Sequence, residues 1–395
     1  MFAVAPIRLM DLARELNHAS RAVGSDLRQR VRPVLDRASA RLSIDSALLE
    51  AALAAIEPTL SLRVVRARVM AITDETADTK TFWLRPNARF GSFRPGSYVT
   101  LQLRIDGQPI ARSYSLSAAP RPDGLIAITV KRVAGGKVSN WLADTLRPGH
   151  VVELSEPRGQ FVLPAQLPGK LLLLSAGSGI TPVMSMLRQL VSLEARPEIV
   201  FCHFARTPRD IIFREELERM ACIDNVRLEL CVESSARIAH EPAWTGALGR
   251  VSEALLLQMA PDFRSLDTFL CGPGAFMQSV LQIFERAGAD LSKLRYERFN
   301  TEFDASQFLE HTQLVRFRRS GTESLSNRPR TILEAAEGAG LSVPFGCRAG
   351  NCGSCRCRKT AGVVVDITSG RASGAGEEFI FPCVSVARGT VEVDL

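Results

Sequence analysis

From residue 62 the chain alternates apolar and polar residues in short runs that are separated by glycine, proline and aspartate. Alternation with a period of two, broken by turn-forming residues, is typical of strands that bury one face. The runs are LRVVRARVMAI, TKTFWLRP, SYVTLQLRI, ARSYSLSAAP, LIAITVKRV and HVVELSEP. This pattern predicts an antiparallel β-barrel over residues 61–167.

Near residue 170 the periodicity changes, and apolar runs of strand length begin to alternate with stretches of helical periodicity. The predicted strands are KLLLLSAG, EIVFCHFA, VRLELCV and DTFLCGPG, and the predicted helices are ITPVMSMLRQLVSL, DIIFREELERM and AFMQSVLQIFERAG. Strands and helices that alternate in this way form a parallel sheet with helices on both faces. The pattern therefore predicts a doubly wound α/β domain over residues 168–299.

A third region follows a linker that we expect at residues 300–310. It contains the strand-like runs QLVRFRR, GVVVDI and GTVEVDL around one short helical stretch, TILEAAEGAG. We expect a separate small α+β domain over residues 311–395.

Residues 1–60 are rich in helical patterns. In SALLEAALAAIEP, Asp45 or Ser46 can cap a helix that Pro58 ends. The preceding stretch, 21–41, carries six arginines and two aspartates. Two interpretations remain open: a helical pair packed on the body of the protein, or a basic arm that docks on a partner or an anionic membrane surface.

Composition narrows the class of protein. The 395 residues are 46% hydrophobic and 23% charged, which suits a globular protein of two or three domains. The net charge of +7 favours an acidic partner or ligand, whereas no basic run indicates nucleic acid. The start, MFAVAPIRLM, lacks the apolar core of a secretion signal, and no run approaches the ~20 apolar residues of a membrane span. We expect a cytoplasmic protein, with any membrane association peripheral.

The stretch GCRAGNCGSCRC contains three cysteines in the spacing Cys347-x4-Cys352-x2-Cys355, and Cys383 follows later in IFPCVS. This is the plant-type [2Fe-2S] spacing. A zinc site would show two C-x2-C pairs, and a Rieske centre needs two histidines, whereas the nearest histidine is His311. The spacing predicts a [2Fe-2S] cluster on the four cysteines.

Residues 311–395 resemble a plant-type ferredoxin domain, in the cysteine loop and in the C-terminal FPCVSVARGTVEVDL. The resemblance implies a β-grasp fold. Cys357, two residues after Cys355, is expected to be a thiol outside the cluster. Such a domain alone would be a one-electron carrier or a redox sensor, so the preceding motifs decide between these functions.

Two motifs in the predicted barrel suit a flavin. In ARSYS an arginine can pair with a pyrophosphate, an aromatic ring can cover the flavin and a hydroxyl can bond a ring nitrogen. In GGKVSNWL the glycines and Ser139 can expose backbone N–H groups to a phosphate at a helix start. Each motif alone is also compatible with an ordinary barrel strand or turn.

Two motifs in the α/β region suit a nucleotide. LLLLSAGSGITP is a strand, a glycine turn and a helix start, in which Gly177 and Gly179 allow a phosphate to approach. Pro182 stands where G-x-G-x-x-G would place its third glycine, so this is not a plain Rossmann fingerprint. FLCGPG ends the last strand at the sheet edge that binds ligands. A βα turn without ligand and a buried structural cysteine are the alternatives.

Taken in order, R-x-Y-S, G-G-x-x-S, G-S-G-I-T-P and C-G-P resemble the ferredoxin–NADP⁺ reductase superfamily over residues 62–300. With the ferredoxin-like domain added, the chain is similar to single-chain reductases that supply oxygenases, hydroxylases and fatty-acid desaturases. The resemblance implies an FAD-binding barrel and an NAD(P)H-binding α/β domain. The G-G-x-x-S element favours FAD over FMN, because FMN has no adenylate half to anchor.

The resemblance also implies roles for individual residues. Those implied to act in catalysis are Ser115, Cys271 and Glu297. Those implied to contact FAD are Arg112, Ser113, Tyr114, Ser115, Val130, Lys131, Gly135, Gly136, Lys137, Val138, Ser139 and Phe299. Those implied to contact the nicotinamide nucleotide are Gly177, Ser178, Gly179, Thr181, Pro182, Cys271, Gly272 and Pro273.

The choice between NADPH and NADH depends on the end of the strand EIVFCHFA. An acidic residue there would suit a ribose 2′-hydroxyl, whereas this chain offers Arg206, Thr207 and Arg209, which suit a 2′-phosphate. The sequence therefore favours NADPH, with two surface arginines as the alternative.

These assignments predict an electron path from NADPH through FAD and the cluster to an acceptor protein. By analogy with the overall layout, we expect a di-iron fatty-acid desaturase or hydroxylase as acceptor. The alternative is a soluble ring-hydroxylating or other multicomponent oxygenase. A non-enzymatic [2Fe-2S] redox sensor is a further hypothesis, although a sensor has no need of the flavin and nucleotide motifs. A flavohaemoglobin is excluded because about sixty N-terminal residues cannot form an eight-helix globin.

Overall fold

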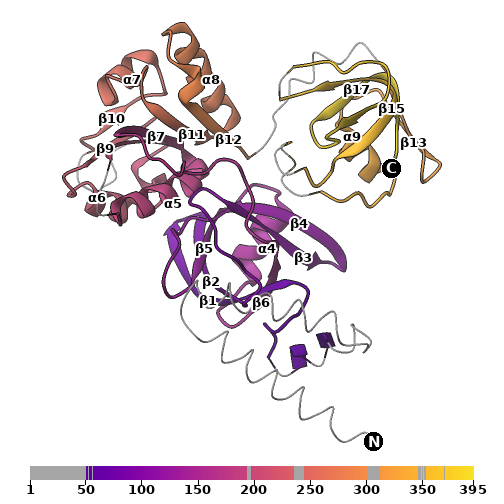
Figure 1. Cartoon of the computed structure of the whole chain (residues 1–395), viewed down its shortest axis with the longest axis horizontal. Helices are drawn as coiled ribbons and strands as arrows, with labels where there is room; N and C mark the ends of the chain where they lie inside the picture. The colour runs from indigo at the N-terminus through magenta and orange to yellow at the C-terminus, as the bar shows by residue number, and fades with distance from the viewer. Residues whose placement is uncertain are drawn as a thin grey trace, which may run out of the picture. The chain divides into compact units, whose positions relative to one another are not determined.

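The computed structural model describes residues 50–51, 53–55, 57–193, 197–234, 244–299, 312–345, 348, 350, 353–368 and 370–395. The chain forms two compact units, Met1–Glu297 and Arg298–Leu395 (Figure 1). The predictions for residues 1–49 lie outside the described residues. The end of the helix expected before Pro58 is described: residues 53–55 are helical, Leu53 is buried, and Glu50 accepts a hydrogen bond of 2.8 Å from the Leu62 N–H.

The first sheet is the predicted antiparallel barrel, with strand order β4-β3-β6-β1-β2-β5. An isolated bridge between Leu116 and Ile128 joins the end of β4 to β5 and closes the sheet. Along β1 the buried Val65, Ala67 and Val69 alternate with more exposed arginines, as the sequence pattern requires. The elements are β1 Val65–Thr76, β2 Thr79–Pro86, β3 Tyr98–Ile105, β4 Gln108–Ser115, β5 Ile126–Lys131, α4 Lys137–Thr145 and β6 Val151–Leu154.

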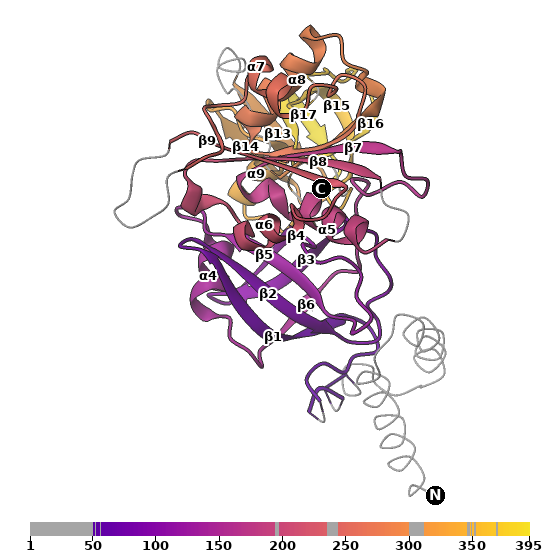
Figure 2. The same ribbon diagram turned by 90° about the vertical axis from the view of Figure 1, so that its left-hand side faces the viewer.

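The second sheet has the order β10-β9-β8-β7-β11-β12, and the pairs from β10 through β11 are parallel. Helices α5 and α6 cover one face and α7 and α8 the other (Figure 2). The predicted doubly wound domain is thereby confirmed. Its elements are β7 Lys170–Ala176, α5 Ile180–Val191, β8 Glu198–Ala205, α6 Arg214–Met220, β9 Val226–Val232, β10 Ala247–Leu248, α7 Glu253–Met259, β11 Asp267–Gly272, α8 Gly274–Arg286 and β12 Leu294–Arg298. Short 3-10 turns stand at Gly177–Gly179, Pro208–Asp210 and Leu291–Lys293.

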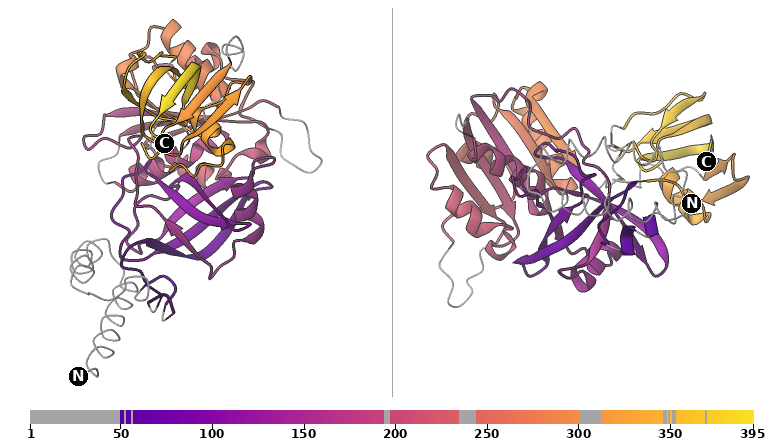
Figure 3. Two further views of the ribbon diagram at one scale, coloured as in Figure 1. Left: turned by 90° about the vertical axis from the view of Figure 1, so that its right-hand side faces the viewer. Right: turned by 60° about the horizontal axis from the view of Figure 1, so that its bottom comes forward.

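The second unit is a mixed five-stranded sheet with one helix among its described residues, drawn in orange to yellow in Figure 3. The strand order is β14-β13-β17-β15-β16, with β13 and β17 parallel and the other pairs antiparallel. A capping box between Thr331 and Glu334 begins the helix. The elements are β13 Gln313–Phe317, β14 Thr322–Ser326, α9 Ile332–Gly338, β15 Cys357–Asp366, β16 Glu378–Ile380 and β17 Ser385–Val393. This agrees with the expected β-grasp domain.

Membrane insertion by a helix has no candidate in the described part of the chain, because none of its helices combines the length and the hydrophobicity that a span requires.

Candidate functional site

Strand β4 presents the ARSYS motif on alternating faces. Its partner β3 lies opposite in register, with Leu101 facing Arg112 and Val99 facing Tyr114. The Tyr114 ring packs half-buried against the barrel core, and burial raises the pKa of its hydroxyl to about 12, against the opposing effect of the Arg112 charge. Ser113, on the other face, shares a hydrogen bond of 2.9 Å with the Thr100 hydroxyl. The strand therefore offers a cation and a ring on one side, as the flavin assignment requires.

The three residues predicted to act in catalysis lie together. The Ser115 hydroxyl donates a hydrogen bond of 3.3 Å to Glu297 Oε2. The Glu297 side chain is buried, which raises its pKa to about 8, and the Ser115 bond opposes this rise. Cys271 is fully buried, and burial, with the nearby Glu297 charge, raises the pKa of its thiol well above the usual range. A neutral carboxyl and a neutral thiol are thus the forms present near pH 7.

The two nucleotide motifs contact each other at the ends of β7 and β11. A Cβ added to Gly179 would lie 2.5 Å from the backbone nitrogen of Gly272, and closer still to the Cys271 carbonyl oxygen. Gly177 has φ +51°, a conformation that favours glycine. The Thr181 hydroxyl donates to the Ser178 carbonyl at 3.0 Å. Only glycine at position 179 permits this approach, which places the GSG turn beside Cys271 at the carboxyl edge of the sheet.

The predicted pyrophosphate contact lies at the start of α4. Gly136 is the N-cap and offers no side-chain cap, and the first turn carries no acidic residue. Gly135 has φ +71°. The Ser139 hydroxyl accepts a hydrogen bond of 3.1 Å from the Val133 N–H, which fixes the loop on the helix. A helix N-terminus without a cap leaves its N–H groups for an anion, so these residues fit a bound phosphate.

Val130 and Lys131 end β5 beside this loop. Val130 is buried in the barrel core. The Lys131 ammonium lies 2.5 Å from Asp78 Oδ1, so in this structure its charge is paired within the protein. A direct contact of Lys131 with FAD stays a prediction.

The cysteine loop is described in part. Cys355 and Cys383 are buried, whereas Cys347 and Cys352 lie outside the described residues. Gly350 and Gly353 have φ +77° and +69°, and a Cβ on Gly350 would lie 3.1 Å from Val384, the residue after Cys383. The tight loop therefore packs against the segment of the fourth cysteine, and cysteines that are buried together in this way fit a [2Fe-2S] cluster.

Three family models match consecutive segments of the chain. They are "Oxidoreductase FAD-binding domain" over residues 66–163, "Oxidoreductase NAD-binding domain" over 173–282 and "2Fe-2S iron-sulfur cluster binding domain" over 316–388. The glycine betaine monooxygenase reductase subunit of Pseudomonas aeruginosa is 36% identical over 347 residues, covering 83% of this chain and 94% of that protein. The chain belongs to the ferredoxin–NADP⁺ reductase superfamily. It is an NAD(P)H-dependent oxidoreductase with FAD-binding and [2Fe-2S] domains.

Other members of the family are similar over most of their length. The "NADPH oxidoreductase" of Mycobacterium tuberculosis is 35% identical over 342 residues, covering 86% of each chain. Among solved structures, phthalate dioxygenase reductase shares the fold with a TM-score of 0.58 and 24% identity, covering 84% of this chain and 98% of that one. The chain thus shares its fold with phthalate dioxygenase reductase over most of the length of both chains.

The arginines predicted to select NADPH lie after β8. The Arg206 side chain is 66% exposed, and its guanidinium lies 3.3 Å from Asp210 and 3.9 Å from Asp78. Asp210 also accepts a hydrogen bond of 2.8 Å from the Thr207 hydroxyl. Arg209 lies in the 3-10 turn that follows. To pair with a 2′-phosphate, the Arg206 guanidinium would have to move away from Asp210 and Asp78.

Phe299 lies in the second unit, just after β12. Its contact with FAD therefore stays a prediction. Glu297, two residues earlier, is the residue of this segment that the structure brings to Ser115.

Sequence reasoning missed two features of the site. His203 is fully buried in β8, its Nδ1 lies 2.9 Å from the Ser175 hydroxyl, and burial lowers its pKa to about 3. Ser175 pairs in register with both His203 and Cys271, so a polar row crosses the sheet beside the nucleotide motifs. The available signal was a histidine in the otherwise apolar run EIVFCHFA. The second feature is the Asp78 carboxylate, which lies between Lys131 and Arg206. No sequence pattern around Asp78 indicates these contacts.

Proposed function

We propose that this protein is the NADPH-dependent reductase of a multicomponent oxygenase. The FAD and [2Fe-2S] domains would hold the cofactors that carry electrons from NADPH to the oxygenase component. The observation that carries the proposal is the meeting of Gly179, Cys271, Glu297 and Ser115 at one place, with the flavin strand β4 ending there. When bound, FAD takes two electrons as a hydride and releases them singly, which a one-electron cluster requires.

The residues of the flavin side bind and orient. In the proposal Arg112 pairs with the flavin phosphates, Tyr114 covers the ring, and the N-terminus of α4 holds the pyrophosphate. The raised pKa of Tyr114 keeps its hydroxyl neutral. Support comes from the alternation of β4 and from the glycine N-cap of α4.

The residues of the nucleotide side pack closely, and one of them holds a proton. Gly179 lets the GSG turn lie against the backbone of Cys271 and Gly272, where a Cβ would collide. Glu297, with its pKa raised to about 8, holds a proton at neutral pH, and the Ser115 hydroxyl fixes the carboxyl. Cys271 acts by packing, because a thiol whose pKa is raised by burial supplies little thiolate for covalent chemistry. Positioning rather than acid–base chemistry is the contribution of these residues.

The acceptor is proposed from relatives. Those with a named substrate are reductase components of glycine betaine monooxygenase, stachydrine N-demethylase and 3-ketosteroid-9-alpha-monooxygenase. These names support the oxygenase alternative over the desaturase expected from the layout, and fatty-acid desaturation has no support among them. The name of the mycobacterial NADPH oxidoreductase agrees with the NADPH preference that Arg206 and Arg209 suggest.

Reconstitution tests the proposal. The purified holoprotein is mixed with NADPH and the oxygenase component of glycine betaine monooxygenase, and in a parallel reaction with a di-iron acyl desaturase. Substrate-dependent NADPH oxidation with the oxygenase, and none with the desaturase, is the expected result. Coupled turnover with the desaturase alone would show that the proposal is wrong and that the acceptor is a desaturase.

A further inference from the structure

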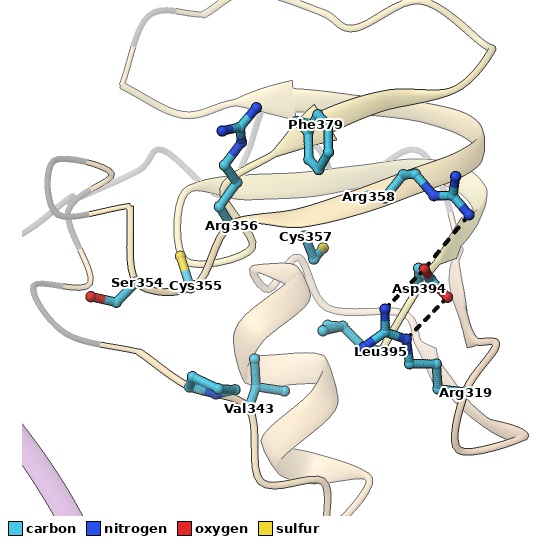
Figure 4. A pocket seen from close by; sticks show the side chains of 11 residues that line it. Arg319, Val343, Ser354, Cys355, Arg356, Cys357, Arg358, Phe379, Asp394 and Leu395 are labelled. Atoms are coloured by element: carbon cyan, nitrogen blue, oxygen red, sulfur yellow. Dashed lines mark hydrogen bonds and ion pairs between the residues drawn. The ribbon is translucent and has the colours of Figure 1, made fainter. Parts of the chain in front are cut away.

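Arg356 and Phe379 form a stacked pair beside a cluster ligand. Arg356 directly follows Cys355, and its guanidinium lies 4.1 Å from the centroid of the Phe379 ring (Figure 4). Phe379 is 61% exposed although it is a large hydrophobic residue. It lies on β16, the edge strand of the sheet, opposite Arg358 in the register of β15. The pair therefore presents an aromatic ring and a cation to solvent at the position next to Cys355.

In the described part of the chain, no carboxylate neutralises the charge of Arg356. Among the residues that the structure describes, no carboxylate lies within 4 Å of its guanidinium. The neighbouring arginines differ: Arg358 lies 3.0 Å from Glu377, and Arg319 lies 3.2 Å from Asp394. Residues 312–395 contain 11 lysines and arginines and 8 aspartates and glutamates, a net charge of +3. This domain therefore attracts acidic surfaces, and Arg356, beside Cys355, is a cation with no carboxylate partner among the described residues.

A recess opens next to the stacked pair. Its volume is about 550 Å³, and Cys355, Cys357, Arg356 and Phe379 lie along it. Val343 and Pro344 add apolar surface, and the ion pairs of Arg319 and Arg358 with Asp394 line the other side (Figure 4). Such a volume accommodates several side chains, and a group inserted there approaches a cluster ligand.

We propose that Arg356, Phe379 and this recess form the docking face for the electron acceptor, and that the acceptor presents carboxylates around an apolar projection. The inference rests on the proposed function. A carboxylate that pairs with Arg356 forms a charge-assisted hydrogen bond. Arginine and aromatic residues often contribute most of the binding free energy of a protein–protein interface. The apolar projection covers Phe379 and enters the recess. In the transfer the acceptor's centre gains the one electron that the cluster loses, and no proton is needed.

Two cytochromes of opposite charge test this face with the complete holoprotein. Cytochrome b5 presents an acidic face around its haem, and cytochrome c a basic one. Rates are measured with NADPH, and the rate of the Cys352→Ser variant is subtracted because it reports direct transfer from the flavin. In Arg356→Glu, the cluster-dependent rate with cytochrome b5 should fall roughly tenfold, and the rate with cytochrome c should not fall. Phe379→Ala should lower the cytochrome b5 rate as well.

Arg388→Glu is the matched control. Arg388 is exposed on β17 opposite Val363 of β15. Its substitution by glutamate changes the charge of the domain by the same amount as Arg356→Glu. Val363 is six residues along β15 from Cys357, which is roughly 20 Å at the rise of a strand. Equal cytochrome b5 rates in Arg356→Glu and Arg388→Glu would overturn the proposal. Concentration-dependent dimers of the wild type that Arg356→Glu abolishes would also overturn it, because a second copy would then occupy the face.

Failure of the inference and failure of the proposed function are distinguishable. NADPH-dependent bleaching of the cluster absorbance in Arg356→Glu reports the internal path. If the cluster is reduced at the wild-type rate and the cytochrome b5 rate is unchanged, the docking face is wrong and the reductase function stands. If NADPH does not reduce the cluster of the wild-type protein, the proposed function itself is wrong.

Discussion

The Ser115 hydroxyl donates a 3.3 Å hydrogen bond to Glu297 Oε2, across 182 positions of sequence. This bond joins the last residue of a barrel strand to the strand at the edge of the nucleotide sheet. Both side chains are buried. The carboxyl is therefore isolated from water and shares its site with Cys271, which gives Glu297 a different protonation state from that of a surface glutamate.

The pH dependence of stability follows from this burial. Because the folded pKa of Glu297 is raised from 4.5 to about 8, the folded protein holds a proton there that the unfolded chain has lost. Its contribution is fully present below pH 4.5 and is lost as the pH rises to 8, by at most about 1.4 kcal/mol per pH unit. Glu297→Gln removes this dependence. Its melting temperature should match that of the wild type at pH 5 and exceed it at pH 9.

Glu285→Gln serves as the control for that comparison, because Glu285 is exposed on α8. Its melting temperature should follow the wild type at every pH. A Glu297→Gln variant that tracks the wild type from pH 5 to pH 9 would show that Glu297 ionises in the folded protein as an ordinary carboxyl does.

A second prediction concerns the contact between the two nucleotide motifs. Gly179→Ala places a methyl group against the backbone of Cys271 and Gly272, which has to shift. A displacement near 1 Å at a reacting centre costs about 100-fold in rate, and overpacking costs about 1–3 kcal/mol in stability. Stopped-flow reduction of the bound flavin by NADPH should slow accordingly.

Gly169→Ala provides the comparison, since nothing lies within 4 Å of the position of its Cβ and its φ is not positive. It should reduce the flavin at the wild-type rate. If Gly179→Ala and Gly169→Ala behave alike, the close approach at Gly179 has no part in nucleotide binding.

The sequence predicted the parts of the site that are local in the chain. The cysteine spacing, the alternation of ARSYS and the glycine turn are short patterns with a direct physical reason. The bond between Ser115 and Glu297 could not be derived this way, because it depends on how β4 and β12 meet in space. His203 was missed because its neighbours are apolar in sequence, while its partner Ser175 lies on the adjacent strand.

The acceptor could not be derived from the site at all. The desaturase expectation followed the layout of the chain, whereas the chemistry of Ser115, Glu297 and Cys271 is the same whichever protein receives the electrons. In our proposal, specificity for the acceptor lies on surface residues such as Phe379, whose exposure shows only in the folded domain. A single sequence carries no pattern that marks them.

The preference for NADPH is a third testable point. Arg206→Ala should lower kcat/KM for NADPH by about 10- to 100-fold, the worth of a charged hydrogen bond, and leave NADH within a factor of about three. Asp210→Asn should raise kcat/KM for NADPH several-fold, because it releases Arg206 from the 3.3 Å ion pair. Steady-state kinetics with both nucleotides measure these changes.

Arg227→Ala controls for loss of a surface charge, because Arg227 pairs with Glu229 on β9. Neither nucleotide should distinguish this variant from the wild type. A wild-type protein that uses NADH as well as or better than NADPH would make the assignment of Arg206 and Arg209 to a 2′-phosphate wrong.

The cluster ligands give the last prediction. Cys383→Ser and Cys352→Ser should lose the [2Fe-2S] absorbance and most of the bound iron, because a serine hydroxyl is a poor substitute for a thiolate. Flavin reduction by NADPH should persist in both variants, whereas reduction of a cluster-dependent acceptor should be abolished.

Cys357→Ser should keep two irons per chain, since Cys357 begins β15 and is not one of the four predicted ligands. Cys222→Ser, at an exposed cysteine outside the loop, is the control for loss of a thiol. Iron analysis and absorbance of the purified variants decide the outcome: loss of the cluster in Cys357→Ser and its retention in Cys383→Ser would exchange the fourth ligand.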